Sequence, residues 1–284
     1  MSREDRNLTY PGYRLAVRGR RLSNLREDLI RQPFWWYAHY TRAEVALNHI
    51  LPAGKLRMSP YRNMRDPVEN KDLTLVTGLA GTSLAASPGI ARLRDLHGAI
   101  RLLSFTAGHD EYGSDALFSC AWARPRMWEQ YADQHKGVCL LFWRYDLDES
   151  LRSELGRLGR YYLRRVRYTP GGFATSQGRG SVISLAAHDV ERSAILGELH
   201  TYRSDFFFLK ASDWASETEY RAVLMEAQAE YAFVSYGRGL VALVLGELFP
   251  SSLIPIAEKA CADAGVALRL ITWSDGIPSL EEVD

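Results

Sequence analysis

The stretch PRMWEQYADQHKGVCLLFW, residues 125–143, joins a short amphipathic helix to an apolar strand and decides the class of fold. The helix begins at a proline, and a glycine at position 137 ends it. The run VCLLFW that follows is apolar throughout and has the length of a buried strand. Four residues fall on one face of this helix and are expected in the core: Met127, Trp128, Tyr131 and Ala132.

Working outward from this stretch, strand-like and helix-like runs follow one another in irregular order. Strands are expected within residues 34–41, 101–107, 239–246 and 266–273. Helices are expected within residues 42–54, 146–165, 184–208 and 250–265. The irregular order predicts an α+β fold, with a mixed or antiparallel sheet flanked by helices. We expect a single domain over residues 36–284, while the arginine-rich residues 1–35 form an arm or a peripheral helix.

The overall charge excludes several classes of function. The chain has 284 residues, with 35 Lys and Arg against 34 Asp and Glu, so its net charge of +1 gives no global attraction for nucleic acid. A nuclease is therefore disfavoured. The three cysteines are too few and too widely spaced for a disulfide framework or a zinc cluster, and no metal is expected. No secretion signal or membrane-spanning run is visible, which predicts a cytoplasmic protein with no membrane partner.

Two polar clusters stand out against the apolar strands. Glu217 and Glu219 are two residues apart at a strand entry, so we expect both carboxylates on one side, with Lys210 and Arg221 near enough to compensate their charge. The alternative is a solvated edge-strand face. His39 lies in FWWYAHYT, where alternation places it on the face opposite Tyr40, and it is either a ligand-binding group or a core histidine bonded to the backbone.

Two further groups of side chains have simpler interpretations. Trp128, Tyr131 and His135 form one helical stripe, which fits either a substrate pocket or an ordinary core. The core is favoured for Trp128 and Tyr131, while His135 lies at the helix end, where a partly exposed histidine is ordinary. Asp66 and Glu69 flank a turn that could bind a cation or cap the next helix, and the cap is favoured because a metal site needs more ligands.

Four motifs in order resemble a large bacterial family of unknown function, domain of unknown function 2971 (DUF2971). They are HYT at 39–41, NMRDPVE at 63–69, MWEQYADQHKGVCLLF at 127–142 and KASDWASETEYRAVL at 210–224. The resemblance covers roughly residues 36–275, and the helix motif is its most specific part. The second motif departs from the family pattern, because two residues interrupt its Asn-Asp-Pro run.

The order of motifs is also similar to that of ADP-ribosyltransferases, which split NAD: an early His-Tyr-Thr strand, a middle strand with Ser or Thr, and a late Glu-x-Glu. This resemblance implies that Glu219 is the catalytic carboxylate, which stabilises an oxocarbenium-like state, and that Glu217 orients the acceptor. Four residues would then bind NAD: His39, Tyr40, Lys210 and Arg221. The role would be in phage defence or as a toxin, and the acceptor could be protein, nucleic acid or a small molecule.

A second class of function fits the same residues. In a non-enzymatic nucleotide-sensing or protein-interaction module, these His, Tyr and Glu side chains would bind a ligand or partner without turnover. The two classes differ in one geometric requirement. A transferase needs His39 and Glu219 in one cleft, whereas a binding module does not.

Overall fold

The computed structural model describes residues 33–64, 95–96, 98–108, 117–170, 192–201 and 203–283. Several expectations lie outside these ranges: most of the N-terminal arm, the turn with Asp66 and Glu69, and the first part of the helix expected within 184–208. The part of that helix that is described forms two helices, α9 (Arg192–Thr201) and α10 (Arg203–Phe207).

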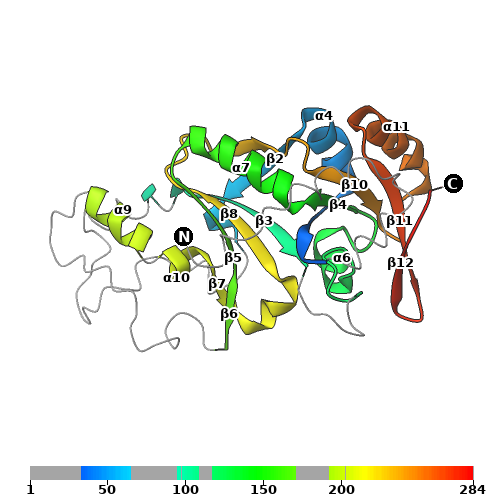
Figure 1. Cartoon of the computed structure of the whole chain (residues 1–284), viewed down its shortest axis with the longest axis horizontal. Helices are drawn as coiled ribbons and strands as arrows, with labels where there is room; N and C mark the ends of the chain where they lie inside the picture. The colour runs from blue at the N-terminus through cyan, green and yellow to red at the C-terminus, as the bar shows by residue number, and fades with distance from the viewer. Residues whose placement is uncertain are drawn as a thin grey trace.

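A ten-stranded sheet forms the centre of the fold (Figure 1). Its main path runs in the order β12-β11-β10-β4-β1-β3-β2-β9. Off this path, β8 pairs with β3 and with β5. These strands are β1 (Trp36–Thr41), β2 (Lys55–Pro60), β3 (Arg101–Ala107), β4 (Val138–Trp143), β5 (Tyr161–Arg165), β8 (Glu219–Leu224), β9 (Ala232–Ser235), β10 (Leu240–Leu245), β11 (Ala267–Ser274) and β12 (Ile277–Glu281). Only the β10–β11 pair is parallel within this sheet, so the mixed sheet of an α+β fold is confirmed.

Helices cover both faces of the sheet, and a small parallel pair of strands, β6 (Arg167–Thr169) with β7 (Leu209–Ala211), lies outside it. The helical segments are η3 (Pro33–Trp35), α3 (Ala43–Val45), the π-helical η4 (Ala46–Ile50), α4 (Leu51–Ala53), η5 (Tyr61–Asn63), α6 (Pro125–Tyr131), α7 (Arg144–Leu158), η8 (Ser212–Glu217), η9 (Ser251–Leu253) and α11 (Ile254–Ala264). The helix expected within 146–165 is wrong in its second half, because it ends at Leu158 and β5 follows Gly159.

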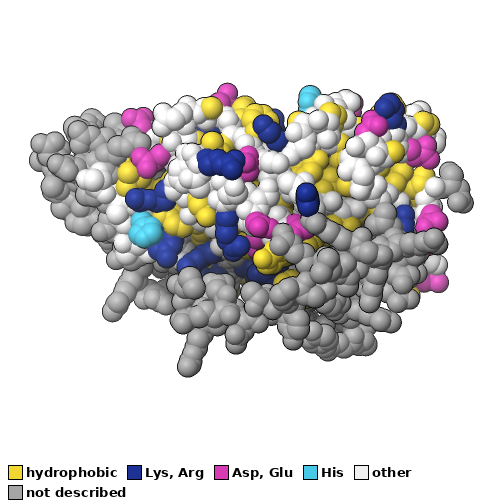
Figure 2. Space-filling model, turned by 45° about the horizontal axis from the view of Figure 1, so that its top comes forward, with side chains coloured by type: hydrophobic (Ala, Val, Ile, Leu, Met, Phe, Trp, Pro, Cys, Tyr) yellow, Lys and Arg dark blue, Asp and Glu magenta, His cyan; other side chains and the backbone are white. Residues whose placement is uncertain are grey.

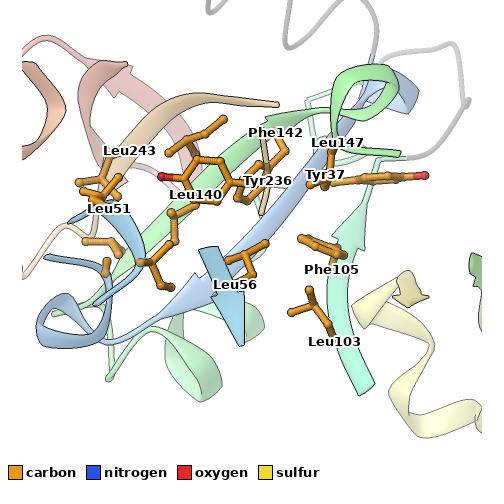
Figure 3. Packing of buried hydrophobic residues seen from close by; sticks show 14 of the residues in the cluster. Tyr37, Leu51, Leu56, Leu103, Phe105, Leu140, Phe142, Leu147, Tyr236 and Leu243 are labelled. Atoms are coloured by element: carbon orange, nitrogen blue, oxygen red, sulfur yellow. The ribbon is translucent and has the colours of Figure 1, made fainter. Parts of the chain in front are cut away.

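The sheet separates two main hydrophobic clusters. The larger one lies beneath α7, α11 and the helical segment 43–53, and Figure 3 shows Tyr37, Phe105, Leu140 and Phe142 packed within it. The second lies beneath α6 and is built on tryptophans, with Trp128 fully buried. Alternation along the strands explains the division, because successive side chains of β1 and β4 point to opposite faces. The expectation of Tyr131 in the core is wrong, because its side chain is 39% exposed.

A left-handed turn links α6 to β4. Asp133, Gln134 and His135 have φ angles of 50°, 54° and 66°, a conformation that L-residues rarely adopt three times in succession. Gly246 permits this turn, because a Cβ atom there would lie 2.0 Å from the His135 carbonyl oxygen. The backbone N–H of Leu248 donates to that same oxygen over 3.0 Å, so the turn is held against the end of β10.

The three cysteines are free and buried. Burial raises the pKa of the Cys120 thiol to about 12, so it stays protonated and unreactive at neutral pH. Within the described ranges, no helix has both the length and the apolar character needed to cross a membrane.

Candidate functional site

Four of the sequence-predicted residues form one buried ionic cluster: Lys210, Glu217, Glu219 and Arg221. The ammonium of Lys210 donates to Glu217 Oε2 over 2.6 Å and to Glu219 Oε2 over 3.2 Å. The guanidinium of Arg221 holds Glu219 with two hydrogen bonds, Nε to Oε1 at 2.5 Å and Nη2 to Oε2 at 2.7 Å. All four side chains are buried, so the alternative of a solvated edge-strand face is wrong.

The two carboxylates reach Lys210 by different backbone routes. Glu217 ends the 3-10 helix η8, and Glu219 begins β8. Thr218 between them is left-handed, with φ of 46°, and its hydroxyl donates to the Ala107 carbonyl over 2.6 Å. The pair therefore converges through this turn and not through regular strand alternation, which corrects the expected geometry.

The cluster keeps Glu219 ionised. Burial raises the pKa of Glu219, but the positive charges and hydrogen bonds of Arg221 and Lys210 outweigh this effect and bring the pKa to about 2. A carboxylate with two cationic partners is a stable anion at neutral pH. Its charge, however, is already neutralised by these neighbours.

We expect the stability contributed by Glu219 to be complete above about pH 4.5 and to be lost as the pH falls towards 2. The folded pKa is about 2 against an ordinary value of 4.5, and this depression is equivalent to about 3 kcal/mol. Urea unfolding of the wild type and of Glu219→Gln, repeated at several pH values between 2 and 6, measures it. The difference between the two should shrink with acidification. Glu230→Gln, an exposed carboxylate, is the matched control, and an equal trend for it would contradict the prediction.

Helix α6 closes one side of the cluster. The Tyr131 hydroxyl donates to Glu217 Oε1 over 2.8 Å. Arg126 Nη1 donates to the Asp213 carbonyl over 2.7 Å, and its guanidinium also stacks on Trp214, 5.0 Å from the ring centre. The helix motif and the Lys-to-Glu motif are therefore in direct contact, although more than 70 residues separate Tyr131 from Lys210 in the sequence.

The structure does not bring His39 to this cluster. Ala38 pairs with Thr106 on β3, and Thr106 pairs with Glu219 on β8, so these three side chains share one face of the sheet. His39 is the next residue along β1 and therefore points to the other face. There its Nδ1 bonds the Ser104 carbonyl over 3.0 Å, and burial lowers the pKa of the imidazole. This is the arrangement of a core histidine bonded to the backbone.

Tyr40 lies on the same face as Glu219, but its hydroxyl bonds the segment before α6 and not the ionic cluster. Its hydroxyl donates to the Ala121 carbonyl over 2.7 Å, and its ring packs edge-on against Trp128 at 5.2 Å. Burial raises the pKa of Tyr40, so the hydroxyl stays protonated. Tyr40 therefore anchors the segment that leads into α6.

Sequence reasoning missed three polar residues near Glu219 and the turn before it. Arg124 precedes α6, and its Nε and Nη2 atoms are buried without a hydrogen-bond partner among the described residues. The Thr106 hydroxyl on β3 is also buried without a hydrogen-bond partner among the described residues. Tyr168 on β6 accepts the backbone N–H of Glu219 over 2.8 Å. An arginine before a helix or a lone strand threonine carries no signal in one sequence, which is why these residues were not singled out.

Comparisons with known proteins support one of the resemblances. The chain matches no curated protein and no solved structure. The ADP-ribosyltransferase resemblance therefore rests on the short motifs alone. Residues 127–222, which include most of α6, the cluster residues and most of β8, match the family described as "Protein of unknown function (DUF2971)" and confirm the resemblance to it over this segment.

Proposed function

We propose that this chain is a cytoplasmic, non-enzymatic nucleotide-sensing module. The observation that carries the proposal is the surplus of positive charge around the cluster. The two negative charges of Glu217 and Glu219 are compensated by the two positive charges of Lys210 and Arg221. Arg124 adds a third positive charge, and no described carboxylate pairs with it. Figure 2 adds that Lys and Arg side chains gather over part of the described surface, although the net charge of the chain is only +1. A local positive site suits a phosphate-bearing ligand.

The rival proposal, an NAD-dependent ADP-ribosyltransferase, fits this geometry less well. Both oxygens of Glu219 are already bonded to cations, so the carboxylate has little negative charge left to stabilise an oxocarbenium-like state. His39 points to the opposite face, where it would be unable to bind the ribose of a ligand beside Glu219. NAD therefore enters this proposal as a ligand and not as a substrate.

Incubation with NAD separates the two proposals. We expect calorimetry to detect binding of NAD or ADP, and mass spectrometry to detect no free nicotinamide above the level of a protein-free control. Glu219→Gln should leave the nicotinamide signal at that same background, as should Glu230→Gln. Nicotinamide release by the wild type that Glu219→Gln abolishes would replace the sensing proposal with the transferase. If neither binding nor release occurs, both proposals fail.

A further inference from the structure

Arg124 is the most incompletely satisfied cation among the described residues of this face. The one hydrogen bond that its guanidinium makes to the described residues runs from Nη1 to the Ser216 carbonyl and is long, at 3.4 Å. Its Nε and Nη2 are buried and without partners in the described part of the chain, although the residue as a whole is only half-buried. Unpaired buried donors on a charged group are costly, and in native proteins they usually indicate a ligand or ordered water.

Two further donors lie next to Glu219. Thr106 is the direct strand partner of Glu219, and its buried hydroxyl has no partner among the described residues. Tyr168 accepts the N–H of Glu219, so its own hydroxyl hydrogen can be donated elsewhere. Burial raises the pKa of Tyr168, which keeps that hydrogen in place at neutral pH. Tyr168 is one of the groups that interact electrostatically with Arg124, after Tyr40 and Cys120. Arg124 reaches the turn before Glu219 through the Ser216 carbonyl, two residues before Thr218.

The identity of these groups restricts the ligand. All of them can donate hydrogen bonds, and the carboxylates of the cluster are occupied by Lys210 and Arg221. Burial is the main cause that lowers the pKa of the Arg124 guanidinium, and the like charge of Arg165 adds a smaller effect in the same direction. A ligand that brings several acceptor oxygens and negative charge would satisfy the donors and relieve the repulsion. A guanidinium fork is well suited to two oxygens of one phosphate.

We propose that Arg124, Thr106 and Tyr168 form a phosphate-binding site, in which the free edge of the Arg124 guanidinium takes two phosphate oxygens and the two hydroxyls donate to the phosphate. This inference deepens the sensing function and rests on it for the source of the phosphate, which is a nucleotide. Tyr40 is a positioning residue here, because it holds the Ala121 carbonyl just before Arg124.

Calorimetric titration with ADP and, separately, with inorganic phosphate tests the site. Arg124→Ala should weaken ADP binding about 10- to 100-fold, the factor that corresponds to losing charged hydrogen bonds. Arg124→Lys keeps the charge but loses the fork, and should still weaken it at least about 5-fold. Thr106→Val and Tyr168→Phe each remove one hydroxyl and should weaken it about 3- to 10-fold. Arg157→Ala, an exposed arginine far along α7, is the matched control and should bind as the wild type does.

The outcomes separate this inference from the function on which it rests. ADP binding that is unchanged in Arg124→Lys, Thr106→Val and Tyr168→Phe would overturn the site while leaving a nucleotide-binding function elsewhere in the chain. Binding of inorganic phosphate that depends on Arg124, without binding of ADP or NAD, would support the site and overturn the nucleotide-sensing function. Absence of binding by the folded wild type, with its melting temperature unaffected by either ligand, would overturn both.

Discussion

Replacement of Arg221 by methionine is expected to lower the free energy of unfolding by about 3–5 kcal/mol. The Arg221 side chain is fully buried and supplies two of the three cationic hydrogen bonds of Glu219, in addition to one from Nη1 to the Phe207 carbonyl at 2.8 Å. Without it, the single ammonium of Lys210 faces two buried carboxylates. The loss is large because an uncompensated charge remains in the interior, not because the original pair was strong. Equilibrium unfolding in urea measures it.

The double variant Arg221→Met with Glu219→Leu provides the decisive control. It removes both partners and leaves Lys210 paired with Glu217 over 2.6 Å. We expect the double variant to be more stable than the single Arg221→Met variant. If the double variant were instead the less stable of the two, the uncompensated buried charge would not be the cause of the lost stability.

Trp128→Ala is expected to cost about 3–5 kcal/mol, because it removes a large, fully buried side chain and leaves a cavity beneath α6. The indole N–H of Trp128 also donates to the Trp122 carbonyl over 2.8 Å, and that acceptor would lose its partner. Thermal and urea unfolding should both report the loss. Trp128→Phe, which refills part of the cavity, should recover a substantial part of it.

Phe233→Ala is the matched control for the tryptophan. Phe233 lies on β9 and is 56% exposed, so its removal should change the stability by less than about 0.5 kcal/mol. A loss for Phe233→Ala equal to that for Trp128→Ala would mean that the aromatic contribution does not follow burial. Burial in the second hydrophobic cluster would then not be what stabilises the folded state.

Much of the fold could be predicted because local patterns agree with the tertiary structure. VCLLFW is apolar on both faces since β4 lies between β1 and β10 with a hydrophobic cluster on each side. The error in the helix expected within 146–165 has a non-local cause. The run YYLRR has no clear periodicity, and its β structure comes from pairing with β8, a partner about 60 residues away.

The candidate site was predictable in part for a similar reason. Lys210, Glu217, Glu219 and Arg221 lie within twelve residues, so a local argument could place them together. The face on which His39 lies relative to Glu219 depends on the register of β1, β3 and β8, which no single-sequence pattern encodes. Arg124 joins the same face only because α6 docks on η8, and this is a tertiary contact.

The central position of β1 sets a problem for the nascent chain on the ribosome. β1 pairs with β3 on one side and with β4 on the other, but it is translated well before either of them. At about 5–20 residues per second, the roughly 100 residues between β1 and β4 take about 5–20 s to emerge. During that interval a mostly apolar strand, WYAHYT, lacks its native partners and can pair with other chains. Slower synthesis or higher cellular concentration should therefore favour aggregation, and a chaperone that covers this strand should raise the yield of folded protein.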